Sequence, residues 1–466
     1  MKIKIEGGRL YDPGNNLDGE ERDIFIEDGI IVEGFSGADK TIDASGKAIM
    51  AGGVDVHSHV ATYGLNLIRG MNRFYSPREI GHIYAKMGYT HVNEPFMTQV
   101  TANYVHHELS SIPILDTSAF LVLNLRDAET KIKSAKHLEE VEKIIPIIIA
   151  GTKAIGLKIY EPFVKYAERK YILRNVTAKK TLSFFSGMSR ESIPRIIMHT
   201  SPELFGEEIE NPGGFHFSHV GSAINNEEAY QKVLHYLNAG ATVDLGLFDL
   251  EQNLRISNPK QTVGEVFGRV DMGLSEDIVF SKGKVSENEA PFFAFKLALS
   301  QPSSHISFST DSPANASFEA YPKIFSWLMK AENRANLFDK ELPDSEYSLL
   351  DIARITRHNP AYILGLKNKG HLGVGAEADI AIYDINEDTK PSELEACFKD
   401  CAWLIKSGCI VVEDHRIVND QVEKKTYYRG VEPLDYEPAK ILTSYSTFRF
   451  ENLMVDEVFT AKEVKV

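Results

Sequence analysis

The sequence predicts an α/β protein: a (β/α)8 TIM-like barrel with a small composite β-sandwich formed from the N- and C-terminal segments. Three observations lead to this prediction. Short alternating apolar runs fill residues 1–50, apolar runs alternate with longer helical patterns through residues 51–364, and β-like runs return in residues 365–425. The expected domains are therefore the sandwich (1–50 and 365–425), the barrel (51–364) and a C-terminal extension (426–466).

The first fifty residues are expected to be strands and turns. Asn15-Asn16 and Asp28-Gly29 are typical turn sequences between alternating runs. The expected strands cover residues 3–5, 9–11, 23–26, 30–32 and 41–42.

The middle of the chain alternates between the two patterns. A doubly wound open sheet would also alternate, but no Gly-x-Gly-x-x-Gly follows a strand, so the barrel is preferred. Such a barrel carries its active site at the C-terminal ends of the strands. The expected strands cover residues 49–60, 90–95, 119–125, 154–160, 195–200, 215–221, 242–247 and 304–310, with helices at 77–87, 135–150, 226–239 and 291–299.

The C-terminal part returns to β structure. A glycine-rich run at 370–379 precedes a strand at 380–383, and two more strands are expected at 402–407 and 410–412. The extension 426–466 is aromatic and charged without clear periodicity. An arm for a partner subunit, a clasp on the barrel and a partly disordered segment all remain open.

Composition excludes several classes of protein. Fifty-one basic against 66 acidic residues give a net charge of −15, which argues against a nucleic-acid surface. No apolar stretch approaches the ~20 residues of a membrane span. Three cysteines, an odd number, predict no disulfide scaffold and a cytoplasmic location. Cys397 and Cys401 are spaced to hold a metal, but buried thiols are the preferred interpretation.

Two histidines end the first barrel strand. His57 and His59 are two residues apart, and in a strand such side chains point to the same face. Imidazoles placed in this way can bind one metal ion. A single His-x-His is a weak pattern, and its weight comes from residues further along the chain.

Four more polar residues lie at the ends of later strands. His199 and His219 end the fifth and sixth strands, and Asp311 follows the eighth. Each alone has an ordinary explanation as a satisfied polar group or a helix cap. Lys158 differs, because an ammonium group inside an apolar strand is costly unless it is paired or uncharged.

A neutral Lys158 amine could take up carbon dioxide, and the resulting carbamate has two oxygens that can bridge two metal ions. His57, His59 and Asp311 would then hold one metal, and His199 with His219 the other. Two-metal sites place the ions ~3.5–4 Å apart. Lys158 and Asp311 are the expected catalytic residues, because Asp311 is also placed to take a proton from the attacking hydroxide and pass it to a leaving amine.

These features resemble the amidohydrolase superfamily, in particular the A subunit of formylmethanofuran dehydrogenase. The resemblance covers nearly the whole chain. It is carried by residues 54–59, 104–109, 112–116, 309–313, 321–322, 352–357, 369–375 and 378–386.

The resemblance implies two zinc ions, an N6-carboxylysine at Lys158 and interconversion of an N-formyl amine of the formylmethanofuran type with formate and the free amine. It also implies partner subunits, since no redox cofactor motif occurs in this chain. The chain departs from the family in the residues after His199 and His219, where substrate-recognition loops are expected. Metal identity stays open, because this donor set suits zinc, nickel, iron or manganese.

Arg69, His106 and His107 are the expected substrate-binding residues, and Arg73 is a further candidate in the same loop as Arg69. Loops on this face of a barrel often carry substrate contacts. Two other function classes remain. One is a stand-alone amidohydrolase of a cyclic amide or N-acyl substrate, as in dihydroorotase or hydantoinase. The other is a metal-free scaffold that binds partners.

Overall fold

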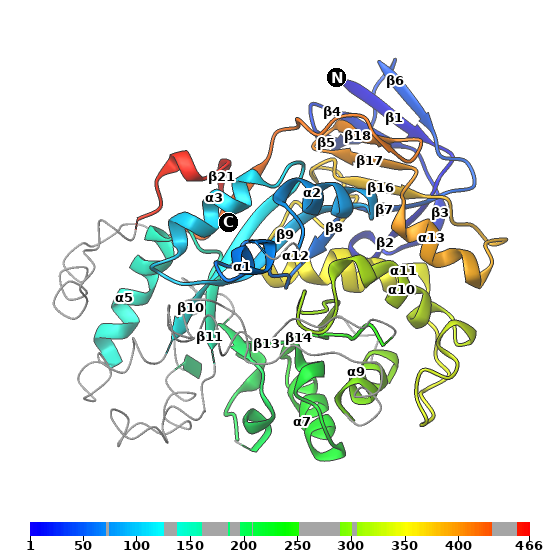
Figure 1. Ribbon diagram of the computed structural model, residues 1–466. Helices are drawn as coiled ribbons and strands as arrows, with labels where there is room; N and C mark the ends of the chain where they lie inside the picture. The colour runs from blue at the N-terminus through cyan, green and yellow to red at the C-terminus, as the bar shows by residue number, and fades with distance from the viewer. Residues whose placement is uncertain are drawn as a thin grey trace.

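The computed structural model describes residues 1–70, 74–124, 138–160, 185–186, 196–206, 208–250, 289–300, 305–430 and 454–466. Figure 1 shows the strands from the N-terminal segment and those between residues 380 and 413 gathered at one side of the molecule. The parallel strands of the middle segment lie beside them.

A parallel sheet runs through the middle of the chain. Its strands pair in chain order from β8 to β15. The last strand returns toward the first through a bridge between Ser58 and Ser312, where the backbone N–H of His59 donates to the carbonyl of Ser312 at 2.8 Å. Every barrel strand expected from the sequence has a counterpart, and the arrangement is consistent with a TIM-like barrel. The strands are β8 (Gly53–Asp55), β9 (Tyr89–Met97), β10 (Asp116–Asn124), β11 (Gly156–Tyr160), β12 (Ile196–His199), β13 (Phe215–Ser218), β14 (Thr242–Asp244) and β15 (Ile306–Ser307).

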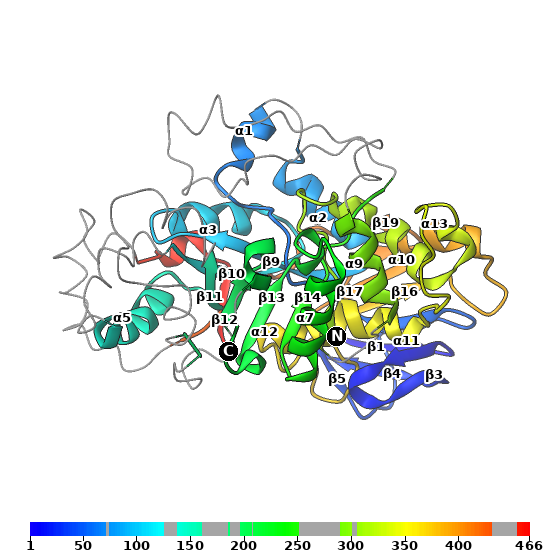
Figure 2. The same cartoon turned by 90° about the horizontal axis from the view of Figure 1, so that it is seen from below.

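The expected helices also form, and α7 shows why. Asn226 caps its N-terminus by accepting from the N–H of Ala229 at 2.9 Å, and two glutamates in the first turn suit the helix dipole. Its apolar face is buried, and Figure 2 shows α7 beside β14. In the described part of the chain no helix is long and apolar enough to cross a membrane. The helices are α1 (Leu65–Gly70), α2 (Pro77–Lys86), α3 (Ala102–Ser111), α5 (Leu138–Gly151), α7 (Glu227–Asn238), α9 (Glu289–Ser300), α10 (Tyr321–Met329), α11 (Leu349–Ala353), α12 (Asn359–Leu364) and α13 (Leu394–Lys399).

Two further sheets are built from the ends of the chain. In the larger sheet β16 pairs antiparallel with β7, which joins the C-terminal strands to the N-terminal ones. Ile3 of the smaller sheet, together with Ile49 and Ile380 of the larger, belongs to one buried apolar cluster. The larger sheet has the order β19 (Arg416–Ile417), β18 (Cys409–Glu413), β17 (Trp403–Lys406), β16 (Ile380–Tyr383), β7 (Ala48–Ala51), β2 (Arg9–Asp12), β3 (Leu17–Glu21); the smaller has β5 (Ile30–Val32), β4 (Ile24–Glu27), β1 (Lys2–Glu6), β6 (Lys40–Asp43).

The expected single strand at 49–60 is wrong in one respect. It forms two strands, β7 and β8, which belong to different sheets and meet at Gly52. A Cβ at Gly52 would lie 2.4 Å from the hydroxyl of Thr90, and one at Gly53 would lie 2.5 Å from the ring of Tyr89. Glycine is therefore needed where the chain passes from one sheet to the next. Strand β3 was not expected, because most of its side chains are exposed and its sequence lacks an apolar alternation.

The described parts of the C-terminal extension lie on the barrel. β20 (Lys425–Tyr428) pairs with β10 and with β21 (Lys462–Lys465). Tyr427 is buried in an apolar cluster with Val54 and Phe120, and Val464 packs against it. Of the three alternatives for this segment, a clasp describes these residues. Residues 431–453 lie outside the described part of the chain.

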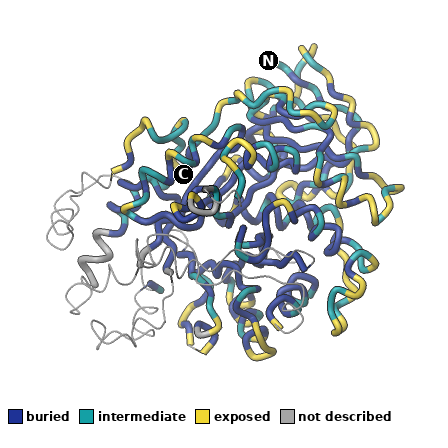
Figure 3. The backbone as a smooth tube through the Cα atoms, viewed as in Figure 1, coloured by how far each residue is buried: buried dark blue, intermediate teal, exposed yellow. Residues whose placement is uncertain are grey.

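A buried group of ions joins the barrel to the larger sheet. Lys369 Nζ lies 2.7 Å from Asp116 of β10 and 3.1 Å from Glu377, and it also pairs with Asp379. Lys406 of β17 lies 2.9 Å from the same Asp116 carboxylate. Buried stretches of the backbone are dark blue in Figure 3, and Asp116, Lys369 and Lys406 are all buried. Opposite charges that compensate each other in this way allow ionised groups to remain where water is excluded.

Candidate metal centre

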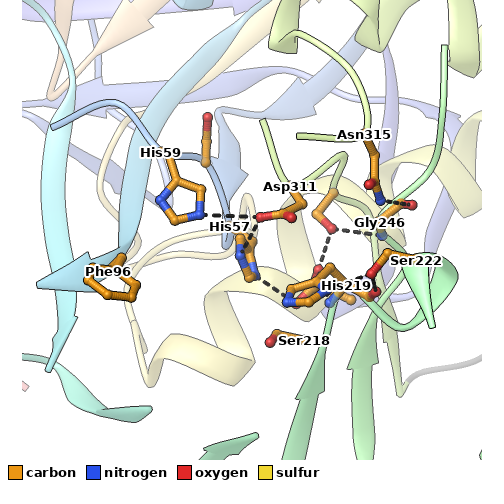
Figure 4. Close-up of polar contacts among 12 residues, drawn as sticks. His57, His59, Phe96, Ser218, His219, Ser222, Gly246, Asp311 and Asn315 are labelled. Atoms are coloured by element: carbon orange, nitrogen blue, oxygen red, sulfur yellow. Dashed lines mark hydrogen bonds and ion pairs between the residues drawn. The ribbon is translucent and has the colours of Figure 1, made fainter. Parts of the chain in front are cut away.

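The predicted ligand side chains gather at the C-terminal ends of the barrel strands, and Figure 4 shows how His57, His59, His219 and Asp311 lie. Parallel strands that pair in chain order bring their C-terminal ends to one edge. His57 and His59 follow β8, Lys158 lies in β11, His199 ends β12, His219 follows β13 and Asp311 follows β15.

One carboxylate oxygen is the meeting point of the first strand's histidines. Asp311 Oδ1 lies 2.9 Å from His57 Nε2 and 3.3 Å from His59 Nε2. The ammonium nitrogen of Lys158 lies 3.4 Å from His57 Nε2, and its side chain is only 2 % exposed. The structure thus brings a carboxylate, two imidazoles and a buried amine together, as the sequence predicted.

The histidines of the fifth and sixth strands lie on the other side of His57. The ring of His219 is 5.2 Å from that of His57 and 4.7 Å from that of His199, centre to centre. Ligand atoms of His57, His219 and Asp311 lie within 4.8 Å of one another. All six residues therefore form one connected cluster.

Hydrogen bonds on the far side of two imidazoles decide where their protons lie. His57 Nδ1 is 3.2 Å from Asp244 Oδ2, and an ionised carboxylate only accepts, so His57 carries its proton on Nδ1. His219 Nδ1 is 2.8 Å from Ser222 Oγ. That hydroxyl donates to the His219 carbonyl and therefore accepts from Nδ1–H. In both residues Nε2 is then the nitrogen left to face a metal ion.

His59 is held in the same way by two residues. Its Nδ1 lies 2.8 Å from Thr62 Oγ1 and 3.2 Å from Glu94 Oε1. Thr62 Oγ1 donates to Glu94 Oε1 at 2.6 Å and so accepts from His59. Glu94 Oε2 also accepts the backbone N–H groups of Val60, Ala61 and Thr62 at 2.7–2.9 Å. Glu94 therefore fixes both the ring of His59 and the loop that follows it.

The backbone is unusual at two of the predicted ligands. His219 has a φ of +39° and Asp311 a φ of +48°, in the left-handed region that residues other than glycine rarely adopt. Such conformations persist where the surroundings enforce them, and they are common at functional sites. In this protein the two left-handed residues, His219 and Asp311, directly follow the barrel strands β13 and β15 or their short extensions.

Burial and charge shift the protonation of the cluster. Burial lowers the pKa of Lys158, although Asp311 and Asp244 oppose this. Burial also lowers the pKa of His219 to about 4. His59 is the exception: burial would lower its pKa, but hydrogen bonds to Asp311 and Glu94 raise it to about 9. Burial would raise the pKa of Asp311, yet the neighbouring histidines hold it well below its ordinary value.

This donor set fits divalent metal ions. Three imidazoles have their Nδ1 atoms held by other residues, so each Nε2 is the nitrogen left to face a metal ion, and a carboxylate oxygen lies within 3.3 Å of two of these Nε2 atoms. Histidines that bind metal typically donate their other N–H to a carboxylate, a carbonyl or a comparable acceptor, which is the arrangement around His57 and His59. The lowered pKa of Lys158 favours the neutral amine that a carbamate requires.

Two residues of the site were not found from the sequence. Asp244, at the end of β14, accepts from His57 and from His216 Nε2, the latter at 3.0 Å. Glu94, within β9, holds His59. The available signal was a carboxylate inside an expected barrel strand, because Glu94 falls in the run 90–95 and Asp244 in the run 242–247.

The predicted substrate-binding residues lie away from the ligand cluster. His106 is buried, and its Nε2 lies 2.9 Å from the carbonyl of Thr152, which precedes β11 and so belongs to the opposite end of the barrel. His107 is exposed, with its ring 5.8 Å from that of Phe459. Both placements argue against substrate contact, and the reason is that α3 runs along the outside of the barrel.

Arg69 braces a loop. Its guanidinium donates to the carbonyls of Val60 at 2.8 Å and Tyr75 at 2.9 Å, and it pairs with Glu108. The guanidinium N–H groups of Arg69 therefore bind groups of this chain, in contrast to the predicted contact with substrate. Arg73 lies outside the described residues.

Known proteins resemble this chain over most of its length. A model of the amidohydrolase family matches residues 273–412. Protein FwdA of Methanocaldococcus jannaschii is 27% identical over 514 residues, which cover 90% of this chain and 89% of FwdA. The A subunit of the formyltransferase/hydrolase complex Fhc of Methylorubrum extorquens is 28% identical over 507 residues, with the same coverage of both chains.

The fold has a close counterpart among solved structures. The crystal structure of the formyltransferase/hydrolase complex FhcABCD from Methylorubrum extorquens, with methylofuran, contains a chain that superposes with a TM-score of 0.81 at 24% identity, covering 100% of this chain and 99% of that one. A shorter match joins this chain to a dihydroorotase of Endomicrobium trichonymphae, 42% identical over 65 residues, or 14% of this chain and 15% of that enzyme. The resemblance predicted from the sequence is confirmed.

Proposed function

This chain is a hydrolase of the amidohydrolase type that resembles the A subunit of a formyltransferase/hydrolase complex, and on that premise we propose that it acts on the C–N bond of an N-formyl amine. The products are formate and the free amine, and the reverse direction is the same chemistry. The proposed substrate is of the formylmethanofuran type, because the related complex was solved with methylofuran.

One observation supports this proposal above the others. The Nε2 atoms of His57 and His59 converge on a single oxygen of Asp311, beside the buried amine of Lys158. Such an arrangement gathers the Nε2 atoms of two imidazoles, a carboxylate and an amine at one point inside the protein, where burying polar groups is costly. A scaffold that only binds partners has no need for it.

We propose two divalent ions, with zinc as the expected metal, and carboxylation of Lys158. His57, His59 and Asp311 would hold one ion. His199 and His219 would hold the other ion, and the carbamate of Lys158 would contribute to both. Lys158 reaches the carbamate when its neutral amine adds to carbon dioxide and loses a proton. The ions would polarise the formyl carbonyl and lower the pKa of the attacking water.

Asp311 is the proposed general base and acid. Its low pKa keeps it ionised, so an oxygen of its carboxylate can accept a proton from the attacking water. The water oxygen joins the formyl carbon, the C–N bond breaks, and Asp311 returns the proton to the departing amine nitrogen. His57 and His59, held by Asp244 and Glu94, keep that carboxylate in place.

Partner subunits are part of the proposal. The related Fhc chain is one subunit of a complex, and this chain contains no redox cofactor motif. Release or capture of formate would therefore be its share of a larger reaction. We also propose a cytoplasmic location and a division of the chain into a composite sandwich, a barrel and a C-terminal extension.

The test is formate release. Purified protein, supplied with zinc, is given N-formyl furfurylamine as the simplest furan-bearing formyl amine, with dihydroorotate and hydantoin as cyclic amides. We expect formate from the first substrate, and loss of at least a hundredfold in kcat for Asp311→Asn, in line with removal of a general acid–base group. Turnover of the cyclic amides alone would overturn the formyl-amide proposal.

A second candidate function is supported by the dihydroorotase match. That match covers 14% of the chain only, so it favours shared chemistry more than a shared substrate. Hydrolysis of a cyclic amide would use the same ligands and the same aspartate. The substrate comparison above distinguishes the two functions, because the metal cluster is common to both.

A further inference from the structure

Asp244 lies at the centre of the contacts behind the metal cluster. It ends β14, its side chain is 0 % exposed, and its two oxygens accept from four groups that lie in or just after other strands of the barrel. Oδ2 accepts from His57 Nδ1 at 3.2 Å and from His216 Nε2 at 3.0 Å. Oδ1 accepts from the backbone N–H of His219 at 2.8 Å and from the hydroxyl of Ser309.

The ion pairs of Asp244 in the described part of the chain are with histidines. His57 and His216 are those partners, and no lysine or arginine among the described residues pairs with it. A fully buried carboxylate is stabilised here by four directed donors. The geometry of those donors is therefore coupled, since moving one of them leaves part of the carboxylate unsatisfied.

Two of these donors belong to different metal positions. His57 would serve the ion held with His59 and Asp311, whereas His219 would serve the ion held with His199. Asp244 fixes the tautomer of the first residue through its side chain and the strained backbone of the second, at φ +39°, through its N–H. Glu94, by contrast, contacts only His59 among the ligands.

We propose that Asp244 is a positioning residue shared by both metal positions, holding His57 with its proton on Nδ1 and His219 in its left-handed turn. This inference rests on the proposed function. It predicts that a substitution of Asp244 weakens metal binding at both positions. A substitution of Glu94 should weaken metal binding at one position only.

The variant Asp244→Asn keeps the size of the side chain but replaces one acceptor by an NH2 group. A donor facing His57 Nδ1 forces the proton onto Nε2, the atom that must bind metal; the same substitution in a serine-protease triad acts through the wrong tautomer. We expect affinity at both positions to fall 10- to 100-fold, as for other partners of metal-binding histidines.

The measurement is zinc affinity by competition with a chromogenic chelator, together with the visible spectrum of the cobalt-loaded protein. Glu94→Gln is expected to weaken one of the two positions and to leave the other intact. Asp12→Asn is the matched control, because Asp12 is also a buried carboxylate that accepts backbone N–H groups, from Gly14 at 3.0 Å and Leu372 at 2.7 Å, outside the barrel. It should leave both affinities unchanged.

Nitrogen-15 NMR of histidine-labelled, zinc-loaded wild-type protein tests the idea even if Asp244→Asn does not fold. The signal assigned to His57, through its loss in His57→Gln, should show a proton on Nδ1 and metal at Nε2. Metal at Nδ1, or wild-type affinity at either position in Asp244→Asn, would overturn the proposal. Metal binding without amide hydrolysis overturns the proposed function alone, and a wild-type chain that binds no divalent metal overturns both.

Discussion

His219 packs directly against Gly246, in space that a side chain at position 246 would fill. It has a φ of +59°, and a Cβ added there would lie 2.8 Å from His219 Cα and 2.9 Å from His219 Cβ. Both contacts are with atoms on or next to the backbone, so the neighbour cannot turn away as a flexible side-chain end would. Gly246→Ala should therefore push directly on a candidate metal ligand.

The magnitude has two parts. A left-handed conformation costs a residue other than glycine roughly 1–2 kcal/mol, and overpacking a tight site costs about 1–3 kcal/mol. The sum lowers the free energy of unfolding by about 2–5 kcal/mol. Gly375→Ala isolates the first part, because Gly375 has a φ of +89° with no atom within 4 Å of the added Cβ.

The assay is urea unfolding of both variants, with zinc affinity measured on the folded proteins. Gly246→Ala should be less stable than Gly375→Ala by about 1–3 kcal/mol, the overpacking part alone. It should also bind zinc about tenfold more weakly, since a displaced ligand that forfeits ~1.4 kcal/mol changes the binding constant by that factor. Equal stability of the two variants, with unchanged zinc affinity, would refute the reasoning.

The further predictions concern three residues. Lys158→Ala should reduce the zinc content per chain by elemental analysis, whereas Lys153→Ala, a lysine paired with Glu463 away from the cluster, should not. The pKa of His59, raised to about 9, means that zinc must displace its proton, so zinc affinity measured from pH 6 to 9 should rise with pH. In the metal-free protein the stability that His59 contributes is present below about pH 6.5 and is lost as the pH rises through about 9, which pH-dependent urea unfolding will show. Lys369→Met should remove about 3–5 kcal/mol of stability in the same unfolding assay, because it leaves buried carboxylates uncompensated, and it should leave zinc content unchanged.

Much of the fold could be predicted from local patterns. The apolar runs of the barrel strands and the capped, amphipathic pattern of α7 report burial directly, so their positions followed from periodicity. The break between β7 and β8 could not be predicted from periodicity. Gly52 and Gly53 look like any pair of glycines until Thr90 and Tyr89 are known to press against them.

The site divides in the same way. The residue types of the ligand set were readable, because an imidazole or an amine at the end of an apolar strand needs a reason to be there. The substrate-binding assignments were weaker. His106 and His107 sit on a helix whose direction relative to the barrel is set by packing, and that packing places His106 against Thr152.

The chemical groups at the strand ends, and their order along the chain, can be read from the amino-acid sequence. Their orientation depends on the folded barrel. His57 and Asp244 are 187 positions apart, yet their hydrogen bond decides which imidazole nitrogen holds the proton. The alternation of residues along a strand tells which face of the sheet a side chain lies on. The hydrogen-bond partner of that side chain depends on the stagger of neighbouring strands and on loops such as the one held by Glu94. The packing of the whole barrel sets both.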